Sequence, residues 1–99
     1  MNYTVYIIYS TKIDKYYIGH TSDIEIRLKE HNEPNLYNNW SKQGIPWNLK
    51  FIINCNTKSQ AIKIEMHIKR NKSRKYLENL QKYPEIAEKL KEKYVDNIG

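Results

Sequence analysis

Two charged residues, Arg27 and Glu65, occupy helical positions where apolar residues are expected. Residues 22–32 read as an amphipathic helix, and Arg27 lies within its apolar stripe. Residues 58–72 read as a second such helix, and Glu65 lies within the stripe of that one. A charged side chain that faces a core is costly unless it is paired or binds a ligand. These two breaks in the local pattern therefore predict a functional site.

Three further side chains can complete this site. Tyr6 and Tyr17 lie on two predicted hairpin strands, where they can sit side by side, and His31 shares a helical face with Arg27. Hydrolysis of a phosphodiester needs positive charge for the phosphate oxygens, a donor for the developing negative charge, and a group that takes a proton from water. Hydroxyls, an imidazole and a guanidinium suit that reaction. One carboxylate, Glu65, is enough for Mg²⁺, which keeps most of its waters.

The net charge of +6 is concentrated in the middle of the chain. Residues 41–82 hold ten Lys and Arg against two Asp and Glu, whereas the two flanking segments carry a small negative excess. Such an electropositive surface suits the phosphate backbone of nucleic acid, with contacts that do not read the bases. A solvated, lysine-rich pair of helices is the alternative interpretation. The densest cluster consists of Lys69, Arg70, Lys72, Arg74 and Lys75.

Composition excludes several other classes. The 99 residues predict a single domain over 1–99, with 96–99 frayed. The lone Cys55 rules out an internal disulfide and a cysteine-cluster zinc site, and its apolar neighbours place it in the core. We therefore expect a reducing, cytoplasmic setting. No apolar run approaches the roughly 20 residues that span a bilayer, and no signal peptide is evident, so no membrane partner is expected.

The elements that would position these residues follow the order β-β-α-β-α-α-α, which predicts an α/β fold of the α+β kind. Ser22 and Glu25 have the form of a capping box, and Asn56 or Thr57 caps the next long helix. His20 and His67 have no evident partner and are predicted to lie on the surface. The predicted strands are 3–10, 15–19 and 48–54, and the predicted helices are 22–32, 58–72, 75–82 and 84–95, with a short helical turn near 36–40.

The ordered set of motifs resembles the GIY-YIG endonuclease superfamily. Tyr17-Ile18-Gly19 matches the second half-motif, whereas Thr4-Val5-Tyr6 stands where the first would have Gly-Ile-Tyr. Arg27 follows at the family's spacing, and Glu65 resembles its metal-binding glutamate. The similarity covers about residues 3–82 and is closest to small stand-alone members, similar to the N-terminal nuclease domain of the ABC excinuclease.

This resemblance implies a role for each candidate residue. Tyr6 would assist deprotonation of the attacking water, and Tyr17 would orient water or phosphate. Arg27 would stabilise the charged transition state, and His31 would carry a proton or contact phosphate. Glu65 would hold a divalent metal, Mg²⁺ or Mn²⁺.

The resemblance also implies a fold and an activity. The fold is a three-stranded antiparallel sheet flanked by helices. The activity is metal-dependent nicking of DNA, selected by structure rather than by sequence, in DNA repair or recombination, with a partner protein as a source of specificity. The alternative is a non-catalytic nucleic-acid-binding module of the same fold.

Overall fold

A three-stranded antiparallel sheet forms the centre of the computed structural model, which describes residues 2–36 and 39–96. Its strands are β1 (Tyr3–Ser10), β2 (Lys15–Thr21) and β3 (Asn48–Cys55), in the order β2-β1-β3. Alternating β-branched and aromatic residues favour these strands. β1 has the predicted bounds, whereas β2 runs two residues beyond the predicted end at residue 19. That extension brings His20 into the sheet.

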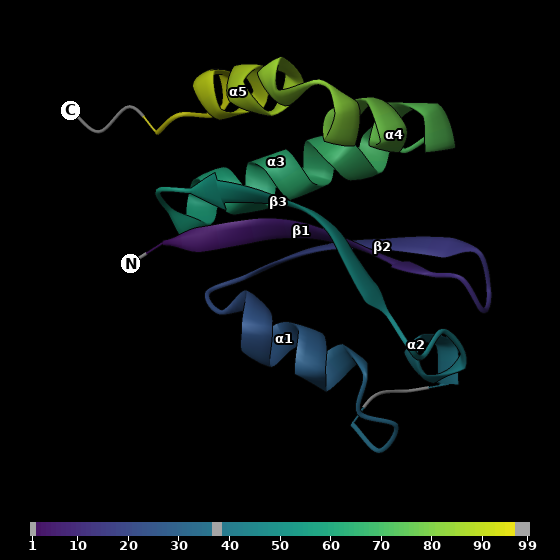
Figure 1. Ribbon diagram of the computed structural model, residues 1–99. Helices are drawn as coiled ribbons and strands as arrows, with labels where there is room; N and C mark the ends of the chain where they lie inside the picture. Colours follow the sequence, from purple (N-terminus) through teal and green to yellow (C-terminus); the bar gives the residue numbers. More distant parts are fainter. Residues whose placement is uncertain (1, 37–38, 97–99) are drawn as a thin grey trace.

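Helices cover both faces of the sheet (Figure 1). α1 (Ile24–His31) and α2 (Asn39–Gln43) lie on one side, and α3 (Lys58–Arg70), α4 (Arg74–Lys82) and α5 (Pro84–Lys93) lie on the other. The predicted order is confirmed. The short helix between α1 and β3 begins later than the turn predicted at 36–40, of which residues 37 and 38 lie outside the described residues. Within the described ranges, no helix combines the length and apolarity that crossing a membrane requires.

Side-chain caps fix where the helices begin. Asp23, not Ser22, caps α1 by accepting a hydrogen bond from the Ile26 amide, so the predicted capping box was wrong by one residue. Thr57 caps α3 as predicted, because its hydroxyl accepts from the Gln60 amide. In both cases a polar side chain satisfies an amide that the first helical turn leaves open.

Each face of the sheet has its own apolar core. The larger core lies under α3, where the predicted stripe of Ala61, Ile64 and Ile68 is fully buried together with Cys55. The smaller core lies under α1 and contains Tyr6, Ile8 and Trp47. Tyr6 is thus a polar hydroxyl within an apolar cluster, which requires a hydrogen-bond partner.

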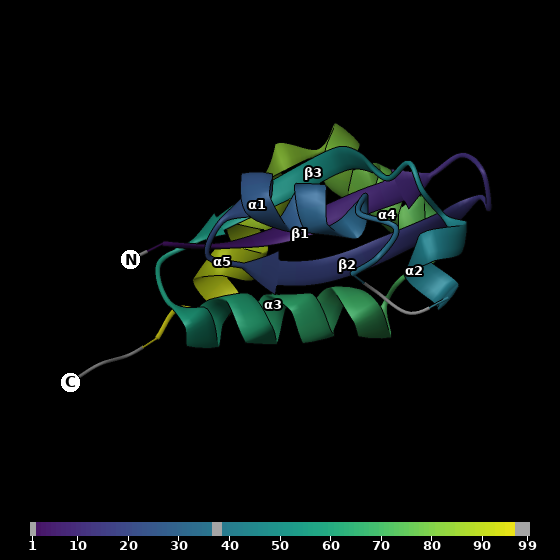
Figure 2. The ribbon, with the colours of Figure 1, turned by 90° about the horizontal axis from the view of Figure 1, so that it is seen from below.

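The two faces meet at the edge strand β2. In Figure 2, β2 runs between α1 and α3, which cover opposite faces of the sheet. Successive side chains of a strand point to opposite faces. β2 therefore presents Tyr17 and Gly19 toward α1, and His20 toward α3, at one edge that both helices can reach.

Candidate active site

The hydroxyl of Tyr6 is the centre of the candidate site. Tyr6 is only 1% exposed, yet its oxygen is fully engaged. Arg27 Nε donates a hydrogen bond to it at 3.2 Å, and His31 Nε2 lies 2.9 Å away. The Tyr17 ring stacks beside it, with ring centroids 6.3 Å apart. The side-by-side placement of the two tyrosines, predicted from the sequence, is confirmed.

His31 supports Tyr6 from the protein interior. The imidazole is 2% exposed, and burial, followed by the nearby Arg27 charge, lowers the pKa of His31 from 6.5 to about 4. The ring is therefore neutral at physiological pH. Because Arg27 can only donate, the hydroxyl proton of Tyr6 remains available to His31 Nε2.

The phenol of Tyr6 is protonated at neutral pH. Burial raises the pKa of Tyr6 to about 12, against the lowering effect of the Arg27 hydrogen bond and charge. In the free protein, Tyr6 is therefore a hydroxyl that can pass a proton on, rather than a standing phenolate.

Gly19 allows the approach of Tyr6 to the strand. Gly19 pairs with Tyr6 across the hairpin, and a Cβ at Gly19 would lie 2.6 Å from the Tyr6 hydroxyl. Contacts this short do not occur between real side chains, so any larger residue would have to displace the buried ring. The glycine of the Tyr17-Ile18-Gly19 motif thus has a steric reason.

Glu65 reaches the same edge from α3. Its carboxylate is 15% exposed, and each oxygen has a partner: His20 Nδ1 lies 2.5 Å from Oε1, and Lys69 Nζ lies 2.7 Å from Oε2. The prediction that His20 is an unpartnered surface residue was wrong, and so was that for His67, which bonds Tyr94. Extending the alternation of β2 by two residues would have placed His20 on the face of α3.

These side chains line one small pocket of about 130 Å³. Four of the five predicted site residues border it, from β1, β2, α1 and α3. His31 does not line the pocket and lies behind Tyr6. The lining residues are Tyr6, Tyr17, Gly19, His20, Arg27 and Glu65.

Comparison with known proteins agrees with this arrangement. The model of the GIY-YIG catalytic domain matches residues 2–79. The chain belongs to the GIY-YIG nuclease family. It is also similar to the solution NMR structure of the UPF0213 protein BH0048 from Bacillus halodurans, at 26% sequence identity and a TM-score of 0.49, covering 81% of this chain and 82% of that chain. None of the curated proteins matches the chain.

The first GIY-YIG half-motif departs from the family pattern without disturbing the site. Thr4 stands in place of the glycine, and its hydroxyl donates to Asn54 Oδ1 at the neighbouring strand β3. The side chain of Thr4 points away from the buried hydroxyl of Tyr6, because Tyr6 lies two residues on and is held from α1. The substitution is thus accommodated by a cross-strand contact.

The GIY-YIG pocket fits a hard divalent cation through a single protein ligand. Across residues 2–36 and 39–96, no three His, Cys, Asp or Glu side chains gather as a metal cage. Mg²⁺ needs only one or two carboxylates, because water and substrate phosphate supply the remaining ligands. Glu65 meets that need, and the Lys69 ammonium already bound to it shows that this carboxylate attracts positive charge.

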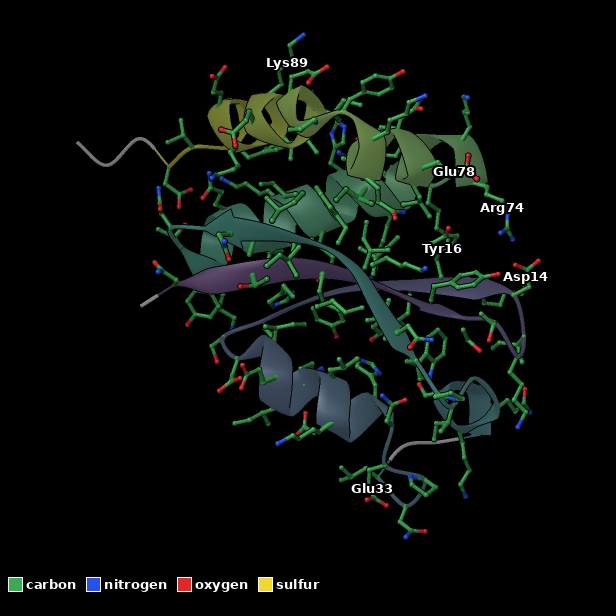
Figure 3. The ribbon with its side chains drawn as sticks, in the orientation of Figure 1. Asp14, Tyr16, Glu33, Arg74, Glu78 and Lys89 are labelled. Carbon is green, nitrogen blue, oxygen red and sulfur yellow. The ribbon has the colours of Figure 1, made fainter. Side chains whose placement is uncertain are left out.

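The basic cluster divides into two groups. Lys69 is held by Glu65, and Arg74 lies 3.0 Å from Asp14 in the hairpin turn, where Figure 3 shows the two side chains together. The hydroxyl of Tyr9 also bonds Asp14. The other three side chains are exposed, and within the described ranges none has an ion-pair partner; these are Arg70, Lys72 and Lys75.

Proposed function

We propose that this GIY-YIG protein is a metal-dependent endonuclease that hydrolyses one phosphodiester of DNA at a time. The observation that carries the proposal is the shared pocket, where Tyr6, Arg27 and Glu65 converge from three separate segments. Hydroxyl, guanidinium and carboxylate are the groups that in-line attack of water on a phosphodiester requires. Their convergence at a solvent-accessible edge leaves room for a phosphate and its attacking water.

Arg27 binds the phosphate in this proposal. Its Nε is directed to Tyr6, and its Nη1 lies 3.2 Å from Glu30 Oε1. These two bonds hold the guanidinium at the pocket, where its planar fork can bind two phosphate oxygens. The positive charge then stabilises the negative charge that develops on the phosphorus oxygens in the transition state. Tyr17, stacked beside Tyr6, orients the water or a phosphate oxygen from the opposite wall.

Tyr6 acts as a proton relay between water and His31. The attacking water gives a proton to the Tyr6 oxygen while the hydroxyl gives its own proton to His31 Nε2, 2.9 Å away. Because both transfers occur together, Tyr6 never carries a full negative charge, and its high pKa is no obstacle. The negative charge of a bound phosphate offsets the charge that His31 gains.

Glu65 supplies the ligand for the divalent cation, Mg²⁺ or Mn²⁺. When bound, the cation supplies a Lewis acid for the phosphate oxygens. His20 holds the Oε1 atom and so fixes the orientation of the carboxylate, as partners of metal ligands commonly do.

The exposed cations Arg70, Lys72 and Lys75 contact the DNA backbone. Backbone contacts position a duplex without reading its sequence, so the protein selects DNA by structure, as in repair or recombination. Additional specificity comes from a partner protein, and the expected location is the cytoplasm. A second candidate is a nucleic-acid-binding module without turnover, which the paired state of both Glu65 oxygens favours.

A plasmid assay separates these candidates. Supercoiled DNA is incubated with MnCl₂ and the wild-type protein, Glu65→Gln, or Glu78→Gln, which removes the same charge from an exposed position on α4. We expect nicked circles with the wild type and with Glu78→Gln, and none with Glu65→Gln. Salt-sensitive binding without nicking in any of them would favour the binding module. Nicking by Glu65→Gln at the wild-type rate would remove Glu65 from the mechanism.

A further inference from the structure

The two oxygens of Glu65 are held in unequal ways. His20 binds Oε1 from a strand 45 residues away, and its side chain is 28% exposed. Lys69 binds Oε2 from the next turn of the same helix, and its side chain is 48% exposed. The contact with Lys69 is therefore the one that can open without moving the sheet or the helix.

The pair of Glu65 and Lys69 differs from an ordinary surface ion pair. Exposed pairs four residues apart on a helix contribute only about 0.3–0.5 kcal/mol, because water screens both partners. Here the carboxylate is largely buried and borders the pocket with Tyr6 and Arg27. An ammonium at 2.7 Å uses the same oxygen lone pairs that a cation would use, and the two positive charges repel each other. Lys69 and a divalent cation therefore compete for Oε2.

We propose that Lys69 is an intramolecular counter-ion that occupies the place of the divalent cation on Glu65 in the free protein and transfers to the DNA backbone when the cation binds. This inference rests on the proposed function and assigns Lys69 a role different from that of the exposed cations Arg70 and Lys72. The pocket then never holds a bare carboxylate. Binding of the cation and binding of DNA become coupled, because each favours the state in which Lys69 has left Glu65.

Calorimetric titration of the DNA-free protein with MnCl₂ tests the first half of this inference. The variants are Lys69→Met, Lys58→Met and Glu65→Gln, where Lys58→Met removes an exposed charge from the first turn of the same helix. We expect Lys69→Met to bind Mn²⁺ at least about three-fold more tightly than the wild type, and Lys58→Met to bind as the wild type does. Equal affinity of Lys69→Met, Lys58→Met and wild type would overturn the inference.

The Glu65→Gln titration separates this inference from the proposed function. Loss of Mn²⁺ binding in Glu65→Gln, with unchanged binding in Lys69→Met, overturns the role of Lys69 and leaves the cation site at Glu65 intact. Mn²⁺ binding that persists in Glu65→Gln overturns the cation site and, with it, both proposals.

Fluorescence anisotropy with a short DNA duplex tests the second half. Affinity is measured against NaCl concentration with and without CaCl₂, for the wild type and Lys69→Met. Each phosphate contact adds about 0.9 to the slope of log affinity against log salt. We expect the wild-type slope to exceed that of Lys69→Met by about one contact with Ca²⁺ and not without it. Equal slopes with Ca²⁺ would show that the released lysine does not reach DNA.

Discussion

Tyr6 and His31, which are 25 residues apart in the sequence, share a buried hydrogen bond of 2.9 Å. The bond joins the central strand of the sheet to the end of α1. It places a neutral imidazole directly behind the hydroxyl that faces the pocket. Structural support of Tyr6 and the removal of its proton thus depend on the same contact.

The buried His31 makes stability depend on pH. Its pKa is about 4 in the folded protein and about 6.5 in the unfolded chain, so the unfolded chain binds the proton first as the pH falls. Stability is therefore complete above about pH 6.5 and is lost progressively toward pH 4. Between pH 7.5 and 5, the expected loss from this group is about 2 kcal/mol.

Urea unfolding at pH 7.5 and pH 5 of the wild type and His31→Gln measures this loss. Glutamine keeps a polar group at the site but does not titrate. The wild type should lose more stability than His31→Gln on acidification, whatever the absolute stability of the variant. An identical pH dependence in the two proteins would show that His31 protonates freely in the fold.

Gly19→Ala should disturb Tyr6 although it adds one methyl group. The new Cβ would lie 2.6 Å from the Tyr6 hydroxyl, which Arg27 and His31 hold in place. Overpacking of this kind costs about 1–3 kcal/mol, and displacement of the ring should also slow nicking. Thermal unfolding and the plasmid assay report the two effects. A variant with wild-type stability and activity would show that the ring has room to move.

Arg27→Lys should slow cleavage while it preserves the charge. Lysine lacks the planar fork, so it cannot bind Tyr6 and two phosphate oxygens together. We expect a fall of about 100-fold in the single-turnover nicking rate, with DNA affinity nearly unchanged. A rate equal to that of the wild type would mean that Arg27 contributes only its charge.

The exposed basic cluster should determine the salt dependence of DNA binding. Replacing Arg70, Lys72 and Lys75 with glutamine should lower the slope of log affinity against log salt by about 2 to 3, because each contact contributes about 0.9. The matched control replaces three lysines of α5, which lowers the net charge equally. That control should leave the slope nearly unchanged, and an equal loss in both variants would indicate binding by net charge alone. The control lysines are Lys89, Lys91 and Lys93.

Much of the fold could be predicted from the sequence because its signals are local. The alternation in β1 and the spacing of Ala61, Ile64 and Ile68 each identify an element and the face that it buries. The start of α1 was placed one residue early, because Ser22 and Asp23 are both good caps and only the backbone geometry selects Asp23. Local patterns thus define elements better than their ends.

The candidate site was predicted only in part, because its remaining contacts are not local. Arg27 and Glu65 were identified as charges within apolar stripes. His20 was missed, since its partner is 45 residues away and β2 was expected to end before it. The engagement of Lys69 with Glu65, and of Arg74 with Asp14, also depends on the folded arrangement. Charge clusters in a sequence do not show which cations are already paired within the protein.

The single-turnover nicking rate of Tyr6→Phe, compared with that of the wild type, tests the catalytic role of the pocket most directly. Phenylalanine keeps the buried ring and removes only the hydroxyl that links Arg27 to His31. With folding verified by circular dichroism and DNA binding by anisotropy, we expect the rate to fall about 100-fold or more. A Tyr6→Phe protein that nicks DNA as fast as the wild type would contradict the relay and the active site built around it.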